Sequence, residues 1–90
     1  MDLRQLRTFI CVAESGSLSR ASDRLRIAQP ALSRQIKLLE KAVGTDLFNR
    51  HVRGMDLTDA GQVLLDRITG PLHQLEQSVF EVKSLDQTIH

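Results

Sequence analysis

Apolar residues recur with helical spacing in two neighbouring stretches of the first half of the chain. Over residues 18–25, apolar positions at i, i+3 and i+7 predict a short helix with Ser17 as its N-cap. Over residues 29–43, apolar positions repeat every three or four residues, and Gly44 is suited to ending that helix. Residues 26–28 would connect the two helices as a short turn. The pattern therefore predicts a helix-turn-helix.

The second of these helices has an apolar side and a polar side. Its apolar stripe consists of Leu32, Ile36, Leu39 and Val43. At about 100° per residue, the opposite side carries Ser33, Arg34, Lys37 and Lys41. A helix with one side in the core and Ser, Arg and Lys on the other is suited to entering the major groove of DNA.

A further helix is predicted at the start of the chain, from Asp2 to Gly16, because acidic residues favour helix N-termini and glycine favours helix ends. Its apolar face consists of Leu3, Leu6, Phe9, Ile10 and Ala13. Val12 falls outside this face. We expect it to be either an exposed valine or a contact with a partner subunit.

The last helix is predicted to begin at Thr58-Asp59, with Thr58 as N-cap, and to run to about Leu85. Apolar residues spaced alternately by three and four form a heptad seam along it: Leu65, Ile68, Leu72, Leu75, Val79 and Val82. A helix of about 40 Å is too long for the rest of this small domain to cover, so we expect its far end to pack on a second copy. Pro71 predicts a kink rather than a break, because the seam keeps its phase through it.

Two short strands are predicted between the recognition helix and the last helix, over residues 47–50 and 55–57, with a polar turn at 51–54. Two strands in this position form a wing. Arg50 and Arg53 would lie at its tip, where they would either contact phosphate or the minor groove or remain solvated.

Charge is distributed unevenly along a chain whose net charge is only +1. Residues 1–54 contain ten Lys and Arg against five Asp and Glu, a net charge of +5, and residues 55–90 contain two against six, a net charge of −4. The basic part includes the helix-turn-helix, which favours a nucleic-acid partner. Few aromatic residues (Phe9, Phe48 and Phe80) argue against stacking on single strands.

The composition gives little support to catalysis, secretion or membrane insertion. The chain has no nucleophile motif and no glycine-rich phosphate loop, and its histidines are scattered: His51, His73 and His90. Cys11 is the single cysteine, which fits a reducing compartment. No apolar run nears 18 residues and no secretory leader is evident, so we expect a cytoplasmic protein. From the scattered histidines and the lack of a phosphate loop, we expect no metal and no cofactor in this chain.

The residues resemble the N-terminal DNA-binding domain of LysR-type transcriptional regulators over nearly all of the chain. The resemblance is carried above all by the run Gln29-Pro30-Ala31-Leu32-Ser33-Arg34-Gln35-Ile36, then Leu47-Phe48-Asn49-Arg50 and Leu57-Thr58-Asp59-Ala60-Gly61. Supporting pieces are Leu3-Arg4-Gln5-Leu6, Gly16-Ser17-Leu18, Ala21-Ser22-Asp23-Arg24-Leu25 and Leu38-Leu39-Glu40. Two positions depart from the family pattern. Ala28 stands where many members have Ser or Thr, and Pro71 lies within the linker helix.

The resemblance implies a mainly α, winged helix-turn-helix of three helices and a two-stranded wing, followed by a long linker helix. We expect the winged domain over 1–58, the linker and dimerisation helix over 59–86, and a tail over 87–90 leading to an effector-binding domain absent from this chain. The family implies homodimers paired through antiparallel linker helices, further assembly into tetramers, and a small-molecule inducer bound by the absent domain.

Within this frame, the DNA contacts can be assigned by side-chain chemistry. We expect Gln29 and Arg34 on base edges, Pro30 on a thymine methyl, and Ser33 on a base or phosphate. Backbone partners would be Ser17, Arg20, Lys37, Arg50 and Arg53, whereas Lys41 lies far along the helix. The family supports Gln29, Pro30, Ser33, Arg34 and Arg53. The alternative function is a winged helix that pairs with protein and does not bind DNA.

Overall fold

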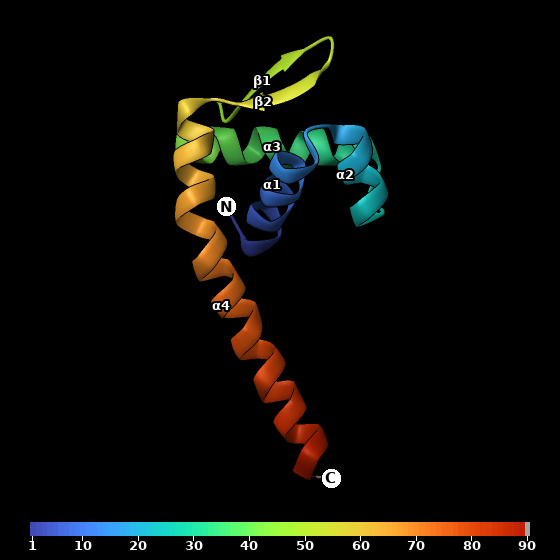
Figure 1. The fold of residues 1–90 in the computed structure, drawn as a ribbon, viewed down its shortest axis with the longest axis vertical. Helices are drawn as coiled ribbons and strands as arrows, with labels where there is room; N and C mark the ends of the chain where they lie inside the picture. The colour runs from blue at the N-terminus through green and yellow to red at the C-terminus, as the bar shows by residue number, and fades with distance from the viewer. Residues whose placement is uncertain (90) are drawn as a thin grey trace.

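The computed structural model describes the backbone of residues 1–89 and the side chains of residues 1–85. Three helices, a hairpin and one long helix follow in chain order (Figure 1): α1 (Leu3–Ser15), α2 (Leu18–Leu25), α3 (Gln29–Val43), β1 (Phe48–His51), β2 (Gly54–Leu57) and α4 (Asp59–Ile89). This confirms the predicted mainly α winged helix-turn-helix with a long C-terminal helix. The linker helix is longer than expected, since residues 87–89 of the predicted tail are helical. Residue 90 lies outside the described residues.

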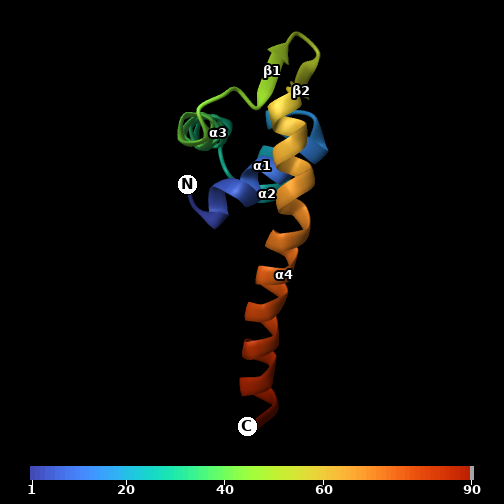
Figure 2. The ribbon, with the colours of Figure 1, turned by 90° about the vertical axis from the view of Figure 1, so that its left-hand side faces the viewer.

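Helix α1 occupies the centre of the molecule, where α2, α3, α4 and β2 all contact it (Figures 1 and 2). Asp2 and Gln5 form a reciprocal capping box at its start, and Gly16, with φ of 73°, ends it in the left-handed conformation. The prediction for Val12 was wrong on both alternatives, because its side chain is 0% exposed within the single chain. A helix enclosed by neighbours on several sides buries more than one face. The amphipathic pattern therefore predicts fewer buried residues than the helix has.

The helix-turn-helix has the predicted bounds. The Ser17 side chain accepts a hydrogen bond from the Arg20 nitrogen at 3.1 Å and so caps α2. At the other end, Arg26 adopts the left-handed conformation with φ of 55°. The Ser22 hydroxyl then donates to the Ile27 carbonyl at 2.6 Å, which fixes the turn into α3.

The wing is a two-residue hairpin whose strands pair Phe48 with Leu57 and Arg50 with Met55. Side chains alternate between the two faces along a strand, and directly paired residues point to the same face. These four residues therefore share the face turned toward the core, where Phe48 and Met55 are buried. Strand β2 is tied to the end of α1 near the tip of the hairpin, because the Met55 nitrogen donates to the carbonyl of Gly16, the residue that ends α1.

Helix α4 leaves the winged domain and extends well beyond it (Figures 1 and 2). The Thr58 hydroxyl accepts from the Gly61 nitrogen at 3.0 Å, as an N-cap residue does, and donates to the Asp46 carbonyl at 2.7 Å. The helix remains one element through Pro71, and its axis changes direction between its yellow start and its red end in Figure 1. No break into two helices occurs in the described part of the chain.

Candidate DNA-binding surface

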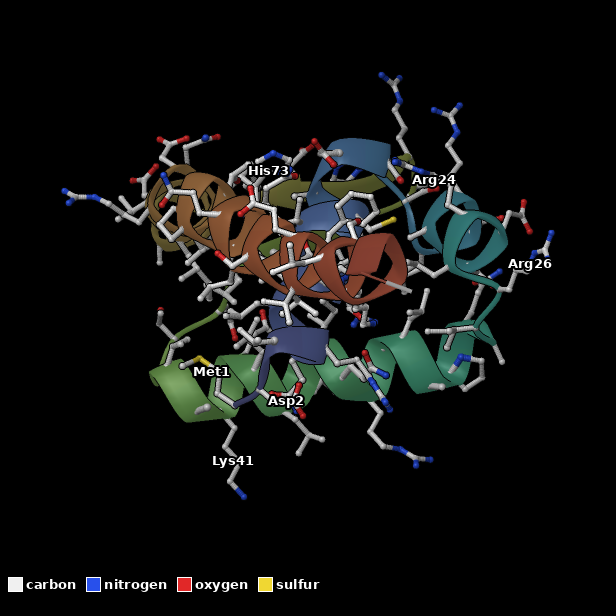
Figure 3. All side chains as sticks on the ribbon, turned by 90° about the horizontal axis from the view of Figure 1, so that it is seen from below. Met1, Asp2, Arg24, Arg26, Lys41 and His73 are labelled. Carbon is white, nitrogen blue, oxygen red and sulfur yellow. The ribbon has the colours of Figure 1, made fainter. Side chains whose placement is uncertain are left out.

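Helix α3 has one side in the core and one side in solvent. The side chains of Leu32, Ile36 and Leu39 are at most 1% exposed, whereas Val43, the last residue of the predicted stripe, is 38% exposed. The opposite side forms an open, shallow groove lined by Pro30, Ser33, Arg34, Lys37, Leu38 and Lys41. Figure 3 shows Lys41 projecting away from the other helices. The polar side predicted for this helix is therefore open to the surroundings along its length.

The N-terminus of α3 lacks a side-chain cap. Ala28 is the N-cap residue, and no side chain bonds to the first turn. The Ala28 carbonyl instead accepts from the nitrogens of Ala31 and Leu32 at 3.0 and 3.1 Å. Because Pro30 has no N–H, the Gln29 N–H is the one donor of this turn without a partner among the described residues. Gln29 and Pro30 are both exposed, so this end of α3 is accessible to a ligand.

The start of α2 contributes two of the residues predicted to contact phosphate. Ser17 is half-buried, and its oxygen accepts the capping hydrogen bond, so its hydroxyl hydrogen stays available to donate to an external ligand without disturbing the cap. Arg20 is exposed, and its side chain makes no hydrogen bond or ion pair within the described residues.

The two arginines of the wing lie in different places. Arg53 is in the two-residue tip, as predicted, and is exposed. Arg50 was placed wrongly, because it lies in β1 on the face turned toward the core. Its Nη2 donates to the Ser33 hydroxyl of α3 at 3.0 Å. The fold thus brings together two predicted contact residues that are 17 positions apart in the sequence.

A histidine also organises the wing tip. His51 Nε2 lies 2.8 Å from an Asp56 carboxylate oxygen, and its Nδ1 accepts from the Arg53 nitrogen at 3.2 Å. The acceptor role of Nδ1 places the ring proton on Nε2, where it faces Asp56. No sequence pattern indicates this role, because the tip geometry that brings His51 to Arg53 depends on the hairpin register.

The predicted heptad seam of α4 divides into two parts. Leu65 and Ile68 pack against this chain's own core, and Leu72, only 4% exposed, lies beside α1. These three residues therefore lie largely within the single chain, where α1 covers the start of the seam. Leu75, Val79 and Val82 are 52%, 55% and 68% exposed. The placement of the interface at these residues stays a prediction.

Two further residues that shape this surface, Glu40 and Thr8, were missed. Glu40 of α3 accepts from the nitrogens of Leu47 and Phe48 and so fixes the path from α3 into β1. Thr8 is 2% exposed and donates to Gln35 Oε1 at 2.7 Å, which links α1 to α3. The one sign of this role in the sequence was that Thr8 is a polar residue among the apolar positions of a central helix.

The arrangement is that of a winged helix-turn-helix with an open, basic recognition helix, the class of domain that reads duplex DNA. The sequence profile described as "Bacterial regulatory helix-turn-helix protein, lysR family" matches residues 3–62. The HTH-type transcriptional regulator BsdA of Bacillus subtilis is 43% identical over 90 residues, which cover 99% of this chain and 31% of that protein. The regulator TfdT of Cupriavidus pinatubonensis is 50% identical over 66 residues, 73% of this chain and 29% of that protein.

Solved structures agree with these relatives. A crystal structure of the CbnR DNA-binding domain in complex with DNA superposes with a TM-score of 0.85 and 36% identity, covering 96% of this chain and 99% of that one. The BenM DNA-binding domain bound to catB site 1 DNA gives a TM-score of 0.87 and 38% identity, covering 96% and 97%. The chain belongs to the LysR family of bacterial regulatory helix-turn-helix proteins. It spans less than a third of the length of the curated relatives described above.

Proposed function

We propose that this domain binds double-stranded DNA sequence-specifically, with α3 in the major groove and the wing on the backbone or minor groove. The observation that carries the proposal is the division of α3 into a fully buried side and an exposed side bearing Arg34, Lys37 and Lys41. The core holds the helix rigidly, so its outer side chains are presented without further folding. The similar domains of CbnR and BenM form complexes with DNA, which supports the proposed binding of duplex DNA.

We also infer that the domain acts as a homodimer through the far half of α4. Beyond Pro71 this helix exposes Leu75, Val79, Phe80, Val82 and Leu85, each more than half exposed. Several of them line a mainly apolar groove shared with α1: Leu3, Arg7, Leu75, Glu76, Val79, Phe80 and Lys83. A heptad seam exposed on a helix is a pairing surface for another helix. A second copy of α4 is the partner that matches this spacing, and tetramers are expected only of longer chains.

A dimer would read a two-part, pseudo-palindromic site, with its recognition helices about 34 Å or a multiple of that apart. The decisive experiment is selection of bound duplexes from a random pool, followed by titration of the enriched duplex. An enriched pair of half-sites with fixed spacing is the expected result. Recovery of no enriched sequence, together with binding that is independent of salt, would instead favour a protein-pairing module.

Some expectations concern the protein beyond this domain. We expect a domain that binds DNA to act at the bacterial chromosome, in the cytoplasm. Among the described residues, none of the helices combines the length and the apolar character of a membrane-spanning segment. Within the same residues, no cluster of three or more His, Cys, Asp and Glu could hold a metal ion. A small-molecule inducer would act through a separate effector-binding domain.

A further inference from the structure

The bond between Arg50 and Ser33 joins the wing to the recognition helix at the surface proposed for DNA. Arg50 Nη2 lies 3.0 Å from Ser33 Oγ. The strand register explains the contact, because Arg50 shares the inner face of the hairpin with Phe48 and is paired with the buried Met55. Ser33 is half-buried and lines the groove that also contains Pro30 and Arg34.

The chemistry of this bond fixes the role of each group. A guanidinium has five N–H donors and no acceptor, so the Ser33 oxygen must accept. The hydroxyl hydrogen of Ser33 has no acceptor among the described residues. In α4, by contrast, the hydroxyls of Thr69 and Ser78 donate to the carbonyl four residues earlier. Ser33 therefore keeps its O–H available, turned away from the guanidinium.

Accepting a hydrogen bond from a cation also changes the strength of the hydroxyl. Hydrogen bonds in a chain polarise one another, so a hydroxyl that accepts from a guanidinium becomes a stronger donor. The same cation makes the oxygen a poorer acceptor for a second donor. The surface thus presents Ser33 chiefly as a directed donor.

We propose that Arg50 is a positioning residue that commits Ser33 to donate to an acceptor atom on the duplex. This inference rests on the proposed DNA binding and adds a specificity rule to it. Suitable acceptors are O6 or N7 of guanine, N7 of adenine, O4 of thymine, or a phosphate oxygen, and the amino groups of cytosine and adenine are the weaker partners of Ser33 because its oxygen already accepts from Arg50.

The test is a double-mutant cycle on the selected duplex, with Ser33→Ala, Arg50→Gln and the double variant measured by fluorescence anisotropy. Ser33→Ala should weaken binding about tenfold, as expected for one lost hydrogen bond. In the R50Q background the same substitution should weaken binding by less than about threefold, because the hydroxyl is no longer oriented. Arg24→Gln is the charge control, since Arg24 lies on the opposite side of the molecule from Lys41 (Figure 3). Thermal melts of every variant verify folding.

Two further measurements identify the acceptor. In the first measurement, every base pair of the site is changed in turn. If Ser33 donates to a base, S33A and R50Q should both flatten the sequence preference at the same base pair. R50K should retain that preference, because an ammonium also only donates. With single methylphosphonates along the backbone, a phosphate partner requires that one substitution removes the effect of S33A. Either result supports the proposal.

The contrary results are equally defined. A tenfold loss from Ser33→Ala in both backgrounds shows that the two residues act independently and overturns the inference, as does unchanged binding by S33A. In either case tight binding by the unmodified chain would leave the proposed function intact. Failure of the unmodified chain to bind duplex DNA would remove the proposed function and the inference with it.

Discussion

The carboxylate of Glu40 lies 2.7 Å from the backbone nitrogen of Leu47, seven residues further along the chain. The same oxygen accepts from the Phe48 nitrogen at 3.3 Å. Leu47 is 1% exposed and Phe48 is 7% exposed, so neither nitrogen has ready access to water as a substitute. One side chain of the recognition helix thereby sets where the wing begins.

Removing this carboxylate should destabilise the domain. Glu40→Ala leaves the Leu47 N–H buried without an acceptor, and we expect a loss of about 1–3 kcal/mol in the free energy of unfolding, measured by urea denaturation. Glu40→Gln keeps one acceptor oxygen and should lose less. Glu14→Ala, at an exposed position of α1, is the matched control and should stay within about 0.5 kcal/mol. Equal stability of E40A and E14A would contradict the role of Glu40.

Two glycines of α4 offer a matched comparison. A Cβ at Gly61 would lie 2.1 Å from the Leu47 carbonyl oxygen, whereas a Cβ at Gly70 would meet nothing within 4 Å. We expect Gly61→Ala to destabilise the domain, because backbone must move to admit the methyl group. Gly70→Ala should stabilise it by about 0.5–1 kcal/mol, since alanine is the better helix former. Thermal unfolding followed by circular dichroism measures both. Opposite signs are the expected result, and a stabilising Gly61→Ala would show that α4 does not approach the Leu47 carbonyl so closely.

Helical periodicity was sufficient to predict α2 and α3 to the residue, and it failed where several elements meet. Both helices are bounded by local signals, Ser17 at one start and Gly44 at one end. Val12 was misplaced because no local signal reports that α1 is enclosed on several sides. Arg50 was misplaced because its partner, Ser33, is determined by hairpin register and by the path that Glu40 fixes.

The burial of Val12 can be tested against another valine. Val12 is 0% exposed, and Val52 at the wing tip is 105% exposed. Val12→Ala removes two buried methyl groups and leaves a cavity, so we expect a loss of about 2 kcal/mol in the free energy of unfolding. Val52→Ala should change it by less than about 0.5 kcal/mol. Chemical denaturation of the two variants under identical conditions provides the measurement, and a negligible effect of V12A would contradict the buried position.

The far half of α4 should control the oligomeric state. Leu75→Gln or Val79→Gln places an amide in the exposed seam, and we expect the dimer to dissociate at least tenfold more readily because a buried amide lacks partners there. Val63→Gln is the control, since Val63 is 57% exposed on the same helix but lies outside the seam. Sedimentation velocity over a concentration series distinguishes monomer from dimer. Variants that remain dimeric at the concentrations of the unmodified chain would place the interface elsewhere.

The two kinds of DNA contact proposed for α3 should differ in their dependence on sequence and salt. Arg34→Ala removes a side chain able to pair with a guanine edge, so we expect a loss of about 1–3 kcal/mol at the selected site and a relaxed preference at one base pair. Lys37→Ala removes a phosphate partner, so it should weaken all duplexes similarly and reduce the salt slope by about one contact. Anisotropy titrations at several salt concentrations, on the selected duplex and a scrambled one, measure both quantities. A uniform loss on every duplex is the property of a backbone contact alone. If K37A shifted base preference while R34A weakened all duplexes equally, Lys37 would be the base contact and Arg34 the backbone contact.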